Sequence, residues 1–172
     1  MKNKKIIIIV CAILLVVAVL LGVYLFWGDD IAVAINGEEL YECVMVSDGE
    51  SAKFDYKYTI YSDKKNKTVN KIEIKQEIES SQEGVIPYYS SVREETYKKA
   101  NETYGGFDYN VETTDNKLSF ELTINYKEVD MEKFLKDYKD YKEFVDKQNR
   151  IKTDGLLSYY EKEGYDCKPK EK

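Results

Sequence analysis

The chain has 172 residues and a formal net charge of −6, from 26 Lys and Arg against 32 Asp and Glu. An acidic chain lacks the basic surface that nucleic acid requires, so we expect no nucleic-acid partner. The chain also contains no histidine, which excludes Ser-His-Asp and Cys-His nucleophile systems and the common histidine-based zinc sites.

Residues 6–27 form an unbroken apolar run that contains no charged side chain. In a helix each residue rises about 1.5 Å, so roughly 20 apolar residues cross a hydrocarbon core about 30 Å thick. Three lysines precede the run within residues 1–5, and Asp29 and Asp30 follow it. This distribution predicts a single-pass signal anchor, with the N-terminus in the cytoplasm and the rest of the chain outside the cell membrane.

Cleavage of the leader is the alternative to its retention as an anchor. A secretory signal has an apolar stretch of about 7–15 residues followed by a small-x-small site, and Ala32-x-Ala34 fits such a site. The longer run and Trp27 at its outer edge favour retention, because tryptophan is enriched at membrane interfaces. Cys11 lies too early in the run for lipid attachment, and we interpret it as a small apolar residue within the bilayer.

The sequence after the leader has the usual size of one domain, and no linker, repeat or low-complexity segment divides it. We predict an α+β fold, in which one domain of antiparallel strands, a meander plus a hairpin, carries helices packed on one face. The expected organisation is a cytoplasmic n-region over 1–5, the anchor over 6–27, a linker over 28–40, the domain over 41–168 and a polar tail over 169–172.

Strands are expected where apolar and polar residues alternate along the chain. The first such stretch surrounds Cys43, the second covers 54–60, and the third covers 72–78. Turn-forming residues separate the three stretches, so they predict the meander. Two further alternating stretches, over 107–111 and 118–126, predict the hairpin.

Three helices are expected between and after these strands. The capping-box pair Ser91-x-x-Glu94 predicts the start of the first helix, and a Gly-Gly pair ends it. Asp130 opens the second, in which apolar residues recur at three- and four-residue spacing through residue 145. A shorter third helix is expected to begin near Thr153 and to end at Gly164.

Two cysteines lie outside the apolar run, Cys43 near the start of the domain and Cys167 near its end. An exported chain meets an oxidising compartment, and these two have only each other as intramolecular partners, so we predict a structural disulfide. In the chain-entropy model, a loop of this length gives roughly 4–5 kcal/mol of stabilisation. Two buried free thiols are the alternative interpretation, and the spacing offers no support for redox catalysis.

Three short strings resemble those of the YehR-like bacterial lipoproteins, which are small surface proteins with one uncharacterised domain. The strings are Tyr41-x-Cys43, Gly106-Phe107-x-Tyr109 and Gly164-Tyr165-x-Cys167-Lys168. The resemblance implies an α+β fold at the cell envelope, and the family's paired cysteines match Cys43 and Cys167. It brings no established activity and no catalytic residues. The leader departs from the family because it lacks a lipidation signal, so a transmembrane anchor would replace the lipid.

Paired carboxylates are the minimum equipment of a glycosidase. The candidate clusters in this chain are Glu38-Glu39, Glu94-Glu95 and Asp137-x-x-Asp140. Each lies among lysines in a segment expected to be solvated, so the preferred interpretation is that these carboxylates are ordinary solvent-exposed surface residues. No loop has the spacing of an EF-hand calcium site, and we expect neither a metal nor a cofactor.

Tyrosine is the most unusual feature of the composition, with 16 residues. Because tyrosine has an apolar ring and a polar tip, six of these residues form a candidate ligand platform. They are Tyr88, Tyr89, Tyr138, Tyr141, Tyr159 and Tyr160, and Tyr165 could line the same groove. The preferred interpretation is instead a core and half-buried sheet faces that are filled with tyrosine.

The anchor, the absence of recognised catalytic motifs and the family resemblance together favour a non-enzymatic protein of the cell membrane. Its domain is expected to face the exterior and to serve binding or interaction, with an envelope protein or a cell-wall component as partner. The alternatives are a surface hydrolase that uses paired carboxylates, and a small-ligand carrier, which requires a closed tyrosine-lined pocket.

Overall fold

The computed structural model describes residues 37–170 of the chain. The predicted anchor over 6–27 and the candidate cleavage site at Ala34 therefore lie outside the described residues. Among residues 37–170, the structure contains no helix that has both the length and the apolar character needed to cross a membrane. Within the described residues, 38–170 belong to one compact unit.

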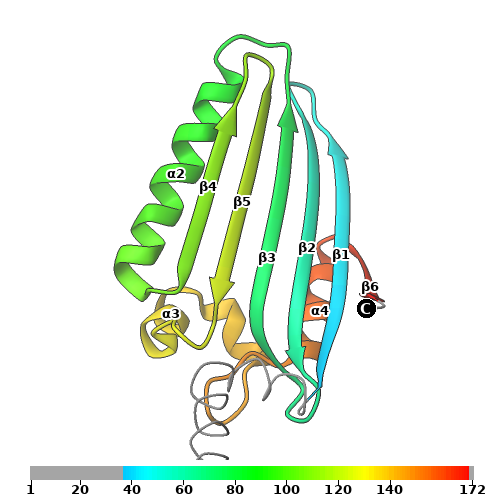
Figure 1. Cartoon of the computed structure of the whole chain (residues 1–172), viewed down its shortest axis with the longest axis vertical. Helices are drawn as coiled ribbons and strands as arrows, with labels where there is room; N and C mark the ends of the chain where they lie inside the picture. Colours follow the sequence, from blue (N-terminus) through cyan, green and yellow to red (C-terminus); the bar gives the residue numbers. More distant parts are fainter. Residues whose placement is uncertain (1–36, 171–172) are drawn as a thin grey trace, which may run out of the picture. The chain divides into compact units, whose positions relative to one another are not determined.

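Six strands make up the sheet of this unit. They are β1 (Glu38–Asp48), β2 (Lys53–Asp63), β3 (Thr68–Glu79), β4 (Phe107–Thr113), β5 (Lys117–Asn125) and β6 (Asp166–Lys170). The spatial order is β4-β5-β3-β2-β1-β6, and every neighbouring pair is antiparallel (Figure 1). The predicted meander is β1-β2-β3 and the predicted hairpin is β4-β5. The last strand, β6, returns to pair with the first at the edge of the sheet.

Four helical segments accompany the sheet. They are α2 (Val85–Tyr104), α3 (Met131–Asp137), the 3-10 helix η1 (Lys139–Phe144) and α4 (Thr153–Lys162). Figure 1 shows α2 running beside β4 at one edge of the sheet and α4 lying near the opposite edge, where it contacts β6. Helices α3 and η1 lie between them in the chain, at one end of the strands. The α+β fold with helices packed on an antiparallel sheet is therefore confirmed.

The first helix begins earlier than the capping-box pattern predicts. The residue before α2 is Gly84, which has a φ of 82°, so Ser91 lies within the helix and not at its N-cap. The extra N-terminal turn carries Ile86, which is buried together with Ala100 near the other end of the helix. Burial of this apolar side chain extends the helix upstream, because packing against the sheet contributes more to helix stability than a local cap pattern.

The second predicted helix is broken into two pieces. Asp130 caps α3 as predicted, since its Oδ1 accepts a hydrogen bond of 3.2 Å from the backbone N–H of Lys133. The helix then ends, and Tyr138 has φ −100° and ψ 74°, which are not helical angles. After this change of direction, η1 places Phe144 against the backbone of Gly155 in α4. The break thus lets residues on both sides of Tyr138 reach the core.

The two faces of the sheet differ in polarity, as the alternation predicts. The inward face supplies the most deeply buried side chains, which are Ile60, Ile72, Ile78, Leu118, Phe120 and Leu122. The outward face carries charged side chains, with ion pairs such as Lys75–Glu121 at 2.6 Å and Lys117–Glu77 at 3.0 Å. Exposed pairs of this kind contribute little to stability. The stability of the fold therefore comes mainly from the buried side chains of the inward face.

A disulfide joins the two strands that come from opposite ends of the domain. Cys43 in β1 is paired with Cys167 in β6 in the strand register, and their sulfurs are bonded. The predicted disulfide is confirmed. The bond fixes the end of the chain beside the start of the sheet, and so it also fixes the position of Tyr165, the residue just before β6.

Candidate ligand-binding cleft

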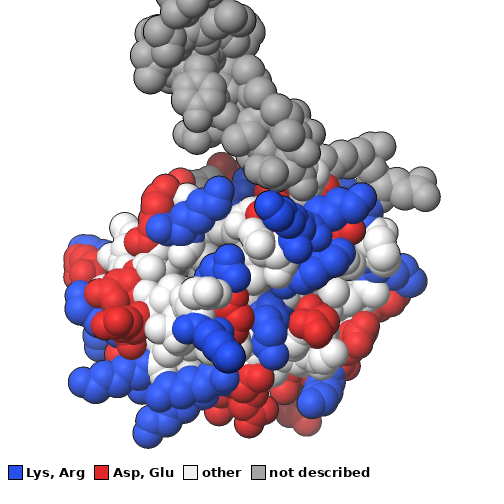
Figure 2. Space-filling model, turned by 90° about the horizontal axis from the view of Figure 1, so that it is seen from below, with Lys and Arg blue, Asp and Glu red and all other residues white. Residues whose placement is uncertain are grey.

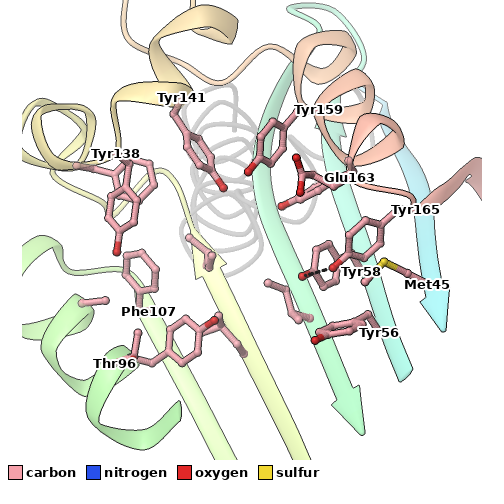
Figure 3. Close-up of a pocket in the computed structure, with 17 residues that line it drawn as sticks. Met45, Tyr56, Tyr58, Thr96, Phe107, Tyr138, Tyr141, Tyr159, Glu163 and Tyr165 are labelled. Carbon is pink, nitrogen blue, oxygen red and sulfur yellow. Dashed lines mark hydrogen bonds between the residues drawn. The ribbon is translucent and has the colours of Figure 1, made fainter. Parts of the chain in front are cut away.

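A cleft of about 540 Å³ lies on the helical side of the sheet (Figure 3). Its floor is formed by inward-facing residues of the central strands, among them Tyr56 and Tyr58 of β2. One wall is α2, which contributes Thr96, and the facing wall is the end of α4 with the segment after it, which contributes Glu163 and Tyr165. Because the two helices lie near opposite edges of the sheet, only long side chains reach across the central strands.

Tyrosine supplies those long side chains. Eight tyrosines line the cleft: Tyr56, Tyr58, Tyr97, Tyr138, Tyr141, Tyr159, Tyr160 and Tyr165. Four of the six residues of the predicted platform are among them. The interpretation that tyrosine fills the core also has support, because Tyr160 is buried. Only the small accessible part of its side chain lines the cleft.

The other two residues of the predicted platform lie elsewhere. Tyr88 and Tyr89 are in the first turns of α2 and do not line the cleft. Tyr88 is 63% exposed, whereas Tyr89 packs against Phe54 with ring centroids 5.4 Å apart. Their adjacency in sequence therefore does not give them a shared site with the remaining four.

A cluster of three tyrosines, from β2, α4 and the segment just before β6, closes one side of the cleft. The hydroxyl of Tyr165 donates a hydrogen bond of 2.9 Å to the hydroxyl of Tyr58 (Figure 3). The ring of Tyr58 lies 4.8 Å from that of Tyr165 and 5.0 Å from that of Tyr160, measured between centroids. These contacts hold the end of α4 and the start of β6 against the floor strand.

Burial raises the pKa values of several tyrosines in the cleft. Burial raises the pKa of Tyr141 to about 12, and it raises the pKa values of Tyr58 and Tyr97 as well. The hydroxyls of these three tyrosines therefore keep their protons, so each can both donate and accept a hydrogen bond. They offer uncharged polar tips on an aromatic surface.

Glu163 is the single charged side chain among the residues that line the cleft. Figure 3 shows it beside Tyr159 and close to Tyr165, on the α4 side of the cavity. The pKa of Tyr159 is raised first by burial and then by the negative charge of Glu163. The carboxylate is thus part of the aromatic wall and not a remote surface charge.

The predicted carboxylate clusters do not meet in this cleft. Glu39 in β1 forms an ion pair of 2.9 Å with Lys67, which is the main cause of its lowered pKa. Glu94 and Glu95 are exposed on α2. Asp137 accepts a hydrogen bond of 2.7 Å from the hydroxyl of Tyr104, and its partner Asp140 is exposed. Within residues 37–170, no group of three or more acidic, Cys or His residues has the geometry of a metal site.

Several cleft residues were not predicted from the sequence. Tyr56 and Tyr58 alternate with polar residues beside the buried Ile60, so their inward direction was readable although their role was not. Tyr165 belongs to the Gly164-Tyr165-x-Cys167-Lys168 string and was a candidate groove residue, and it does line the cleft. Glu163 lies outside any motif, and no sequence signal marks it.

The family of the chain follows from a comparison with family models. A model described as Domain of unknown function (DUF8824) matches residues 44–172. The chain belongs to this family. The DUF8824 domain includes every residue that lines the cleft. None of the curated proteins matches the chain.

Two solved structures are similar to this DUF8824 domain. The NMR structure of the YehR protein of E. coli is 14% identical, covers 80% of this chain and 95% of YehR, and gives a TM-score of 0.53. The NMR structure of a protein from Streptococcus pneumoniae TIGR4 is also 14% identical, covers 77% of this chain and 86% of that one, and gives a TM-score of 0.47. At this identity the match to YehR shows a shared fold alone, and it supports the predicted YehR-like domain of unknown function.

Proposed function

We propose that the protein is a non-enzymatic binding protein of the cell envelope and that its ligand site is the tyrosine-lined cleft. The observation that carries this proposal is a cavity of about 540 Å³ with eight tyrosines in its lining. Ligand sites are typically concave, largely apolar and supplied with a few polar groups that orient the ligand. Tyrosine ring faces and hydroxyls meet both requirements.

The surface hydrolase has less support than binding. A glycosidase needs two carboxyl groups roughly 5–10 Å apart on either side of the bond that it cleaves. The lining of the cleft holds one carboxylate, that of Glu163. A single carboxylate among neutral tyrosines can orient a ligand, and it lacks the partner that acid–base hydrolysis requires. The proposal is therefore binding without covalent chemistry.

The proposed location rests on the sequence together with the disulfide. The apolar run over 6–27 with its preceding lysines favours a single-pass anchor, and the Cys43–Cys167 bond suits an oxidising compartment outside the cytoplasm. On the described part of the face in Figure 2, basic and acidic side chains are interspersed. An envelope protein or a cell-wall component suits this mixed surface better than a polyanion. Protease added to intact cells should remove the domain, and a protected C-terminus, or mature protein in the medium starting at Ile35, would contradict this location.

The binding proposal is tested by filling the cleft. Thr96 is exposed on α2 and lines the cavity, so Thr96→Trp places an indole in the cleft without disturbing the core. Thr103→Trp is the matched control, because Thr103 is exposed on the same helix and outside the lining. The full-length chain in uncharged detergent micelles is incubated with envelope extract, and the retained small molecules are identified by mass spectrometry.

The expected result is a compound that the unmodified chain and Thr103→Trp both retain and Thr96→Trp does not. Equal retention by all three chains would place binding outside the cleft. No retained compound would also contradict the proposal, because the cleft would then have no ligand in its own envelope.

A further inference from the structure

The lining of the cleft contains an acidic residue and no basic residue, although the chain is rich in lysine. None of the residues that line it is Lys or Arg, and Glu163 supplies its single charge. Some carboxylates elsewhere on the described domain are paired with lysine, as Glu42 is with Lys57 at 2.6 Å, and others have no such partner. The hydrogen bonds and ion pairs of the described residues include none for the Glu163 side chain. This carboxylate therefore faces the cleft without a protein cation to balance it.

The tyrosine rings around Glu163 add to the negative potential. The rings of Tyr56 and Tyr165 are 6.0 Å apart at an angle of 66°, and those of Tyr159 and Tyr160 are 5.7 Å apart at 57°. Rings that meet at such angles are not stacked face to face, so at least one ring of each pair has faces that the other ring does not cover. The face of an aromatic ring is the negative end of its quadrupole, and it attracts a cation within about 6 Å of the ring centroid.

We propose that the cleft binds an organic cation, with an ammonium group held between Glu163 and the surrounding tyrosine rings. This inference rests on the proposed function and names its ligand class. An anionic ligand would be repelled by Glu163, and no lysine or arginine in the lining would compensate. A neutral ligand would remove water from the carboxylate and leave it without a partner, which is unfavourable. A cation with an apolar body satisfies the carboxylate and the rings together.

An ammonium group can come from a free small molecule or from a lysine side chain of a peptide. Two probes distinguish these sources. Acetylcholine carries a quaternary ammonium group, and Nα-acetyl-lysine methylamide presents a primary ammonium group on a peptide-like backbone. The uncharged carbon isostere of acetylcholine, 3,3-dimethylbutyl acetate, has the same shape without the charge. Binding of each probe to the full-length chain in uncharged maltoside micelles is measured by calorimetry, with empty micelles subtracted.

The matched variants are Glu163→Gln and Glu161→Gln. Both residues are exposed and both changes remove one negative charge near the end of α4, but only Glu163 lines the cleft. We expect the unmodified chain to bind at least one cationic probe about tenfold more tightly than the neutral isostere. Glu163→Gln should abolish most of that preference, whereas Glu161→Gln should keep it. Preference for the lysine probe would indicate a peptide source, and preference for acetylcholine a free quaternary ammonium compound.

Three results would overturn the inference. They are equal affinity for the cation and its isostere, equal effects of the two variants, and no binding of either cation up to about 10 mM, where even a weak site would be detected. If the isostere binds and Thr96→Trp prevents it, the cleft is still a ligand site and only its charge preference is wrong. If nothing binds, the cation inference fails, and the proposed function stands or falls with the extract experiment.

Discussion

The tyrosines in and around the cleft combine deep burial with a titratable hydroxyl. Burial raises the pKa of Tyr126 and Tyr160 well above the usual value, and it raises that of Tyr141 to about 12. The cause is the same in each case, because a phenolate in a water-poor interior loses the hydration that stabilises its charge. As neutral phenols these residues stabilise the folded domain, and ionisation of them would destabilise it.

We predict that the domain loses stability in alkali, from the pH at which unfolded tyrosines ionise. A free phenol titrates near pH 10, whereas Tyr141 in the folded domain titrates near 12. Between these values the folded state binds more protons than the unfolded state, so the free energy of unfolding falls as the pH rises. The contribution is complete below pH 10 and is lost as the pH passes through the folded pKa.

Tyrosinate absorbance and circular dichroism during an alkaline titration measure this loss. Ionisation of the buried tyrosines and unfolding of the sheet should occur in one cooperative step. Smooth tyrosine ionisation near pH 10 with an unchanged circular dichroism signal would show that the phenols are accessible and would contradict the prediction.

At the scale of secondary structure, the sheet was predictable and the helices only in part. Alternation is a local property, so the inward residues of β2, β3 and β5 follow directly from the printed sequence. The start of α2 depends on burial of Ile86 against the sheet, and a local capping pattern does not contain that contact. The break at Tyr138 similarly depends on where α4 lies, since apolar residues keep a helical spacing on both sides of it.

The contact between η1 and α4 gives a test of this interpretation. A Cβ added at Gly155 would overlap the Cβ of Phe144, so Gly155→Ala forces the two segments apart. We expect the substitution to lower the free energy of unfolding by about 1–3 kcal/mol, which is typical of overpacking a well-packed site. Chemical denaturation measures the change. Ser158→Ala is the control, because Ser158 is exposed on the same helix and alanine is a better helix former. Equal stability of the two variants would show that the close contact is not maintained in solution.

At the scale of the whole molecule, the cleft is a product of chain closure. Its lining extends from Met45 in β1 to Tyr165 just before β6, and these ends meet because the last strand pairs with the first. The cysteines indicated that closure from the sequence, since two thiols in a chain that is predicted to be exported are expected to pair. Tyr165 was a candidate groove residue from the sequence, whereas the place of Glu163 in the cleft was not predictable, because it depends on where α4 ends relative to the sheet.

The disulfide should therefore support the cleft as well as the fold. Replacing both Cys43 and Cys167 by alanine removes the covalent link between β1 and β6, whose pairing covers only Leu40 to Val44 of β1. We expect a loss of up to roughly 4–5 kcal/mol of stability and faster hydrogen exchange in β6 than in the central strands. When β6 separates, Tyr165 leaves Tyr58, so ligand affinity in the cleft should fall together with protection of β6.

Cys11→Ala is the control for this experiment, because it removes a cysteine and leaves the Cys43–Cys167 bond intact. Thermal unfolding and hydrogen exchange are measured for both variants, with probe binding as the functional readout. If the double variant kept full protection in β6, strand pairing alone would hold the end of the chain. If it lost that protection but bound the probe unchanged, Tyr165 would not be needed to form the wall of the cleft. Joint loss of β6 protection and binding would show that one covalent bond maintains both the closure of the sheet and the shape of the site.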